Sequence, residues 1–433
     1  MSKTLFEMPF QLCTAAGGCR GLDAGFGGPL CPPPARAPAE AGPVRAMDAI
    51  PRESKGESPQ VMMHHGEEAP VPYGRAPAAA DGRAPAACRG IFDRTLLGGT
   101  ELPNRIFRAA VGDRTEDGAP GPASLDLYGA LADGGAGSIV TGFTIVDELE
   151  KGFMPIFSLA EDRLIGAHRA LTDLVHSKGA RIFAQLVQIG SYQSEEFHKA
   201  VTPRLPFLTL MSPSGLHDPV SGAAPREITP SEIRRVQSKH AEAAARAVKA
   251  GYDGVEIHAA HGFLLSQFMQ PGLNRREDDY GGSPAGRARM ALETYRAVRS
   301  AVGACYPVLM KVNVMDGFEG GCVFGEVLEL CRSLSREGLD AVETSGCWRK
   351  IPEGSGPFFL KEAGEMAARI TAKVILTGGL RTREDMRAAL DSARVEYLGV
   401  ARPLMRDPDF VDRIRREDRM AAESAAAAAS AAQ

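Results

Sequence analysis

Two hydrophobic periods alternate along most of the chain. Amphipathic stretches with an apolar residue at every third or fourth position predict helices, and short runs rich in β-branched and other apolar residues follow them. Glycines stand at four of the joints, where they suit the left-handed residue that ends a helix before a strand begins. These are Gly135, Gly179, Gly251 and Gly338. The repeat of helix, glycine and strand extends from Ile91 to about Asp418.

Eight of the short runs are nearly continuous in apolar residues, which is typical of parallel strands buried on both faces. They cover residues 104–111, 138–143, 181–187, 254–260, 307–313, 341–345, 373–378 and 396–402. Eight strands that alternate with helices predict an α/β protein with a (β/α)8 barrel, the TIM barrel. An open doubly wound sheet is the competing architecture. It is disfavoured because no G-x-G-x-x-G follows the first strand and because a helix over 407–418 closes the eighth unit.

The helical patterns can be assigned faces and caps. The longest pattern covers 233–251, and its expected apolar face consists of Ile233, Val236, His240, Ala244 and Val248. Another pattern covers 384–392, and Thr382 is the expected N-cap before it.

The chain divides into three parts by composition. Residues 1–88 are dominated by Ala, Gly and Pro without helical or strand periodicity, which predicts a disordered N-terminal extension. Residues 89–418 are expected to form the barrel. Residues 419–433 are nearly all alanine and serine, and we expect a frayed tail there.

Composition and charge exclude several functions. The chain has 433 residues, of which 44% are hydrophobic, and a net charge of −4, so a nucleic-acid partner is not expected. The eight cysteines are scattered, which fits reduced thiols and a cytoplasmic protein. No stretch of 18 apolar residues is present, so no membrane association is expected. The oligomeric state, including a homo-oligomer, stays open.

Candidate chemistry follows from position, because reactive groups of a barrel gather at the C-terminal ends of its strands. Two glycines after the seventh strand, Gly378 and Gly379, together with Arg402 after the eighth, predict a site for a phosphorylated ligand. Lys311 on the fifth strand is expected to face a negative group. A flavin would supply one, with the Gln185 amide at its pyrimidine edge, and a structural carboxylate is an equally open explanation.

The segment DGVEIHAAHGFLLSQFMQPGLNRREDDYGGSPAGRARM, with LPNRIFRAAVGDRTEDGAP, LTGGLRT and GVARPLMRDPDF, resembles the old yellow enzyme family, specifically its NADH:flavin oxidoreductase branch. The resemblance covers nearly all of Ile91 to Asp418. It implies a barrel that binds FMN, takes hydride from NADH or NADPH and passes it to a small electrophilic substrate such as an enone.

Residue by residue, the resemblance implies three groups of contacts. His258 and His261 correspond to the pair that binds the oxygen of a carbonyl or nitro group and stabilises its developing charge. The implied flavin contacts are Ala109, Ala110, Val111, Gly112, Gly142, Gln185 and Lys311, and the implied phosphate contacts are Gly378, Gly379, Ala401 and Arg402. A metal site is not expected, because two histidines without further convergent ligands make poor zinc chemistry.

Two expected pocket residues depart from the family pattern. Phe263 replaces a tyrosine that commonly donates the proton to the substrate α-carbon, and phenylalanine has no hydroxyl to donate. Gly112 stands where family members often carry a polar side chain. The alternatives to an ene-reductase are therefore a quinone or nitro reductase, or a non-catalytic flavin-binding redox module.

Overall fold

A computed structural model describes residues 89–431 except 114, 116, 151–155, 192–209, 218–224, 348–355 and 393. The N-terminal extension expected over 1–88 lies outside the described residues.

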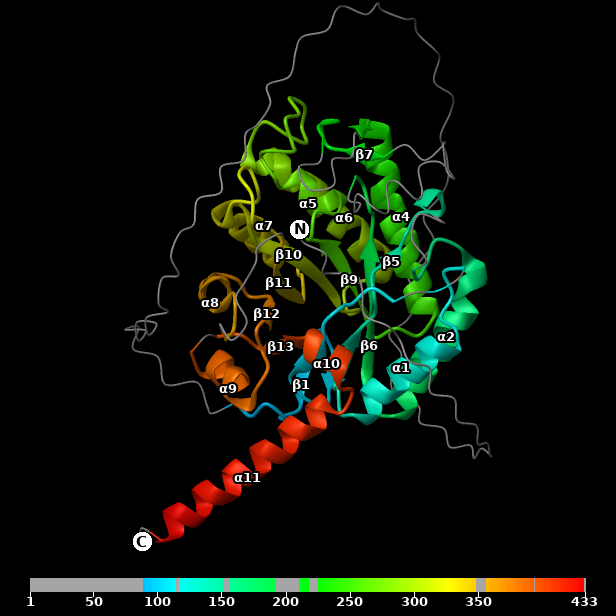
Figure 1. The fold of residues 1–433 in the computed structure, drawn as a ribbon. Coiled ribbons are helices and arrows are strands. Elements are labelled where there is room, and N and C mark those ends of the chain that lie inside the picture. The colour runs from blue at the N-terminus through cyan, green and yellow to red at the C-terminus, as the bar shows by residue number, and fades with distance from the viewer. Residues whose placement is uncertain are drawn as a thin grey trace, which may run out of the picture. The chain divides into compact units, whose positions relative to one another are not determined.

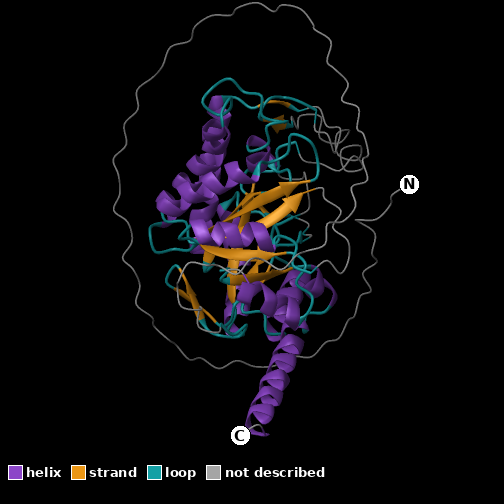
Figure 2. Ribbon diagram, turned by 90° about the vertical axis from the view of Figure 1, so that its left-hand side faces the viewer, coloured by secondary structure: helices purple, strands orange, loops and turns teal. Residues whose placement is uncertain are grey.

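Eight parallel strands close into a barrel, with helices around it (Figures 1 and 2). The strands are β3 (Ile106–Arg108), β4 (Ser138–Val140), β6 (Arg181–Val187), β9 (Gly254–Ala259), β10 (Val308–Asp316), β11 (Ala341–Cys347), β12 (Lys373–Thr377) and β13 (Tyr397–Val400). Each pairs in parallel with the next, and β13 pairs with β3 to close the circle. All eight predicted strands and the TIM barrel fold are confirmed.

The remaining elements cover the outside and the ends of the barrel. The longer helices are α1 (Pro122–Asp133), α2 (Ile165–Ser177), α4 (Pro230–Lys249), α6 (Pro284–Val302), α7 (Phe324–Arg336), α8 (Leu360–Arg369), α9 (Arg383–Ser392) and α11 (Phe410–Ala431). Short elements are β1 (Thr95–Leu97), β2 (Thr100–Leu102), β5 (Thr144–Ile145), β7 (Met211–Ser212), β8 (Arg226–Glu227), η1 (Glu148–Glu150), η2 (Asp162–Leu164), α5 (Leu264–Phe268) and α10 (Arg402–Arg406). None of the helices within the described ranges has the length and apolar character needed to cross a membrane.

Local sequence explains where the helices begin and end. All four joint glycines have positive φ, between 80° and 89°, as their positions predict. Thr382 caps α9 by accepting the backbone N–H of Asp385 at 3.1 Å, which confirms that prediction. The apolar face of α4 is confirmed except at Val248, which is 42% exposed. Fifteen residues separate it from Ile233, so it has rotated off the buried face, where Ala247 packs instead.

The C-terminal tail is helical rather than frayed. Helix α11 continues to Ala431 and extends away from the barrel beyond its buried residues Phe410, Val411 and Ile414 (Figure 1). Alanine has the highest helix propensity of all residues, so an alanine-rich segment can continue a helix that packing has already nucleated.

The barrel interior changes from apolar to polar along the strands. The layer nearer the N-terminal ends of the strands is an apolar cluster. It includes Phe107, Val140, Phe183, Leu309, Ala341, Ile375 and Tyr397. Side chains two residues further along a strand lie on the same face. The next inward layer therefore holds Gln185, Glu256, Lys311, Glu343 and Thr377, which leads to the C-terminal mouth where the candidate residues lie.

Candidate functional site

Lys311 lies in the polar layer and is 2% exposed. Its Nζ donates to Glu343 Oε1 at 2.8 Å, and Thr377 Oγ1 donates to the same oxygen at 2.7 Å. Gln185 Nε2 donates to Glu256 Oε2 at 2.6 Å. The structure therefore gives Lys311 a protein carboxylate as its partner, which was one of the two explanations that the sequence left open.

The two histidines lie together at the end of β9, with their ring centroids 5.0 Å apart. The backbone N–H of Ala260 donates to His258 Nδ1 at 3.3 Å, which makes Nδ1 an acceptor and leaves the proton on Nε2. His261 has φ of 59°, a rare conformation for a non-glycine residue, and its N–H donates to Asn313 Oδ1 at 3.1 Å. His261 Nε2 and Ser345 Oγ form a hydrogen bond of 2.6 Å.

Both imidazoles are neutral at ordinary pH. Burial lowers the pKa of His258 well below its usual value, and His261 and the Lys311 charge lower it further. Burial and Lys311 lower the pKa of His261 to about 3, although Glu343 acts in the opposite direction. A neutral imidazole can offer one N–H donor without carrying a buried charge.

Aromatic side chains form a wall beside the histidines. Phe263 is 3% exposed, and its ring centroid lies 4.8 Å from that of His258 and 5.4 Å from that of Phe143. A Cβ on Gly112 would lie 2.9 Å from Cε1 of Phe143, so the missing side chain at 112 makes room for this ring. Sequence reasoning did not assign a role to Phe143, although it directly follows Gly142.

The loop after β3 is held against the ends of β13 and β4. Ala109 N–H donates to Val400 O at 2.9 Å, and Gly142 N–H donates to Asp113 Oδ2 at 2.9 Å. A Cβ on Gly142 would lie 2.5 Å from Val111 O, so only glycine permits this approach. Asp113, which the sequence did not nominate, also forms a 3.4 Å ion pair with Arg108.

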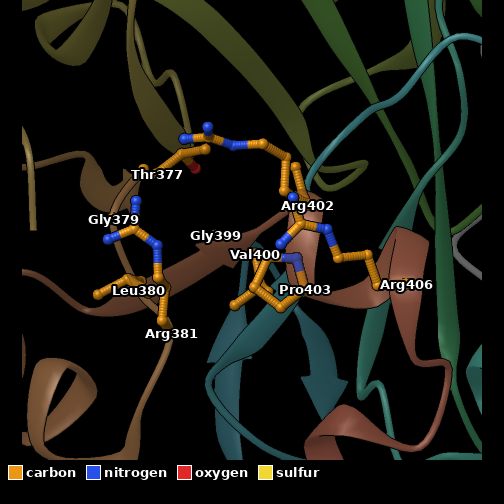
Figure 3. A pocket seen from close by; sticks show the side chains of 11 residues that line it. Thr377, Gly379, Leu380, Arg381, Gly399, Val400, Arg402, Pro403 and Arg406 are labelled. Atoms are coloured by element: carbon orange, nitrogen blue, oxygen red, sulfur yellow. The ribbon is translucent and has the colours of Figure 1, made fainter. Parts of the chain in front are cut away.

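A cavity of about 80 Å³ lies between the ends of β12 and β13 (Figure 3). It is lined by Thr377, Gly378, Gly379, Leu380, Arg381, Gly399, Val400, Ala401, Arg402, Pro403 and Arg406. The structure thus brings together all four predicted phosphate residues. Figure 3 shows Arg381 and Arg406 on opposite sides of the cavity, with the Arg402 side chain extending across it towards Thr377.

Two details of this cavity would suit an anion. Gly378 and Gly379 have φ of 112° and 81°, and a Cβ on Gly379 would lie 1.8 Å from Gly356 O. The guanidinium groups of Arg381 and Arg402 lie 5.6 and 5.8 Å from the ring centroid of Phe358. Arg381, Arg406 and Phe358 were missed from sequence, although Arg381 follows Gly379 in the same loop and Arg406 ends the short helix that Arg402 begins.

The cavity and the histidine pair are connected through the polar layer. Thr377 lines the cavity and donates to Glu343, which binds Lys311, and the charge of Lys311 acts on both histidines. The glycine and arginine chemistry of the cavity fits the phosphate of FMN. An ammonium has three N–H donors and an amide has both donors and an acceptor, so Lys311 and Gln185 fit the polar edge of a flavin ring.

Known proteins share this architecture. Residues 91–420 match the model of the NADH:flavin oxidoreductase / NADH oxidase family. A metal reductase of Desulforamulus reducens is 32% identical over 330 residues, which cover 74% of this chain and 48% of that protein. The chain thus spans about half the length of this relative. A 4,4'-dithiodibutanoate disulfide reductase of Rhodococcus erythropolis is 30% identical over 366 residues, which cover 76% of this chain and 88% of that protein.

Among solved structures, morphinone reductase superposes with a TM-score of 0.65 at 26% identity and covers 76% of this chain and 90% of its own. The resemblance that the sequence motifs indicated is therefore confirmed. The chain belongs to the NADH:flavin oxidoreductase / NADH oxidase family.

Proposed function

We propose that the protein is an FMN-dependent NAD(P)H oxidoreductase that reduces an activated alkene, such as an enone, or a related small electrophile. The observation that carries the proposal is the orientation of His258, whose neutral ring holds its proton on Nε2 at the barrel mouth. An N–H donor in a water-poor site stabilises negative charge that develops on a substrate oxygen.

The cofactor would be held at two places. Gly378, Gly379, Ala401 and Arg402 would bind the phosphate, while Ala109, Ala110, Val111, Gly112, Gly142, Gln185 and Lys311 would surround the ring. Bound FMN would supply the hydride that the substrate accepts. The chain's own residues bind and orient the two partners, and Phe263 and Phe143 exclude water from the space beside the histidines.

His258 and His261 would together receive the substrate oxygen. Two hydrogen bonds fix His261: its backbone N–H donates to Asn313 Oδ1, and its ring Nε2 pairs with Ser345 Oγ. With the serine hydroxyl as donor to Nε2, the neutral ring would offer Nδ1–H to the substrate. These bonds position the ring before substrate arrives, so little reorganisation is needed during the reaction.

Measuring turnover with an enone tests the proposed reaction. Purified protein with FMN and either nicotinamide nucleotide is mixed with cyclohexenone under anaerobic conditions, and nucleotide oxidation is followed by absorbance. We expect oxidation that depends on the enone. Absence of enone-dependent oxidation, despite bound FMN, would contradict ene-reduction.

The residues proposed to bind the FMN phosphate, Gly378, Gly379, Ala401 and Arg402, give a separate prediction. Arg402→Ala should weaken FMN binding about 10- to 100-fold, because hydrogen bonds to charged groups contribute about 1.5–3 kcal/mol. Quenching of flavin fluorescence on titration of the protein measures the dissociation constant. Arg413→Ala is the control, since its guanidinium lies over Phe410 rather than in the cavity, and an equal loss in both variants would argue against the assignment.

Phe263 favours a second candidate function, reduction of quinones or nitro compounds, because these acceptors do not require a tyrosine to protonate an α-carbon. Phe263→Tyr should raise enone turnover, because its hydroxyl would stand next to His258. It should leave the rate of flavin reduction by the nucleotide unchanged. Stopped-flow measurement of the two half-reactions tests this, and an unchanged enone rate would show that proton donation is not limiting.

A further inference from the structure

Two glutamates face each other inside the barrel, beneath the candidate site. Glu256 on β9 is fully buried, and Glu343 on β11 is 1% exposed. Glu256 Oε2 accepts from Gln185, and Glu343 Oε1 accepts from both Lys311 and Thr377. The second oxygen of each carboxyl, Glu256 Oε1 and Glu343 Oε2, is buried without any hydrogen-bond donor in the described part of the chain.

If both carboxyls were ionised, the second oxygen of each would have no hydrogen-bond donor. An ionised carboxylate only accepts hydrogen bonds, so two orphaned oxygens would repel each other in a medium that screens charge poorly. The carboxyls of Glu256 and Glu343 are close enough to act on each other's pKa both by charge and by a side-chain hydrogen bond. One proton placed between them would make one carboxyl a donor and the other an acceptor, and both orphaned atoms would gain a partner.

We propose that Glu256 and Glu343 share one proton, with Glu256 as the acid and Glu343 as the carboxylate, and that this pair neutralises Lys311 beneath the cofactor site. The polar layer then contains one cation, one anion and one neutral acid. Lys311 acts on the mouth as half of a neutral ion pair rather than as an isolated positive charge. Glu256 and Glu343 are thus positioning residues for the charge that faces the site.

The surrounding groups agree with this assignment. Burial and the neighbouring Glu343 raise the pKa of Glu256 well above its usual value, although Lys311 and Gln185 oppose the rise. Burial also acts to raise the pKa of Glu343, but Lys311 and the bonds from Glu256 and Thr377 hold it below its usual value. The other titratable groups nearby, His258 and His261, are neutral, and the facing residues of β6 and β12 are the uncharged Gln185 and Thr377.

The first test uses Glu256→Gln, which replaces a neutral acid by a neutral amide of the same shape. Folded wild type keeps a proton that the unfolded chain releases above pH about 4.3, so this stabilisation is complete below that pH and is lost as pH rises towards the folded pKa. The unfolding constant of wild type, divided by that of the variant, should therefore rise about tenfold per pH unit above about pH 5, until the folded pKa of Glu256 is reached. A ratio that does not change with pH would overturn the proposal.

The second test needs no change within the pair and needs no added cofactor. Protein labelled with 13C-glutamate should show the infrared C=O band of a carboxylic acid at neutral pH. Burial also raises the pKa of Glu150 to about 8, so the spectrum is recorded on Glu150→Gln, in which the remaining band belongs to the pair. Loss of the whole band in this variant would overturn the shared proton, even if Glu256→Gln failed to fold.

The effect on the site rests on the proposed function and is measured separately. With FMN bound, Glu256→Gln should leave the midpoint potential of the flavin unchanged, because a neutral group replaces a neutral group. A more positive potential would show that wild type carries two ionised glutamates, and would overturn the proposal. Failure to bind FMN would contradict the proposed function, while the unfolding and infrared results would still decide the shared proton.

Discussion

His258→Ala is expected to lower kcat/KM for an enone about 10²- to 10³-fold, the usual loss when one donor to a developing oxyanion is removed. The backbone N–H of Ala260 makes Nδ1 of His258 an acceptor, so the ring presents Nε2–H, which alanine cannot replace. Steady-state kinetics with cyclohexenone and a nicotinamide nucleotide measure the effect, and flavin absorbance shows whether FMN is retained.

The matched control is His240→Ala. His240 is also fully buried, and its Nδ1 bonds to Val236 O within α4 rather than at the barrel mouth. Both variants should lose stability by deletion of a buried ring, but only His258→Ala should lose activity. Because burial lowers the pKa of both mouth histidines, the wild-type rate should show no histidine titration at neutral pH. Equal activity losses in the two variants would remove His258 from the mechanism.

Lys311→Met should destabilise the fold by about 3–5 kcal/mol at neutral pH, because removal of one partner leaves a buried charge uncompensated. The Nζ–Oε1 distance is 2.8 Å, and the two side chains are only 3% and 1% exposed. The midpoint of urea unfolding measures the loss. The loss should shrink as pH falls, since Glu343 has a lowered pKa in the fold and its contribution disappears when it is protonated.

Two comparisons separate the buried pair from charge in general. Lys239→Met removes an ammonium that pairs with the half-exposed Glu148 and Glu242 on the surface, and should cost no more than about 1 kcal/mol. The double variant Lys311→Met, Glu343→Gln should recover most of the stability, because it removes the uncompensated carboxylate as well. A loss of under 1 kcal/mol for Lys311→Met would show that another group balances Glu343.

Local patterns determined much of the fold and part of the site. The eight strands, the positive φ of the four joint glycines and the Thr382 cap depend on side-chain periodicity and on the backbone preferences of single residues. The sequence also determined that His258, Gly378 and Gly379 lie at the barrel mouth, because a barrel gathers the C-terminal ends of its strands there.

Only the tertiary structure decided how the polar residues pair. Lys311 and Glu343 are 32 positions apart, and Gln185 and Glu256 are 71 apart, so their contacts depend on strand order and register. A glutamate within each of the apolar strands GVEIH and AVETS was a visible signal of a polar interior. The sequence cannot say which buried charge compensates which, because that depends on the distances that the closed barrel imposes.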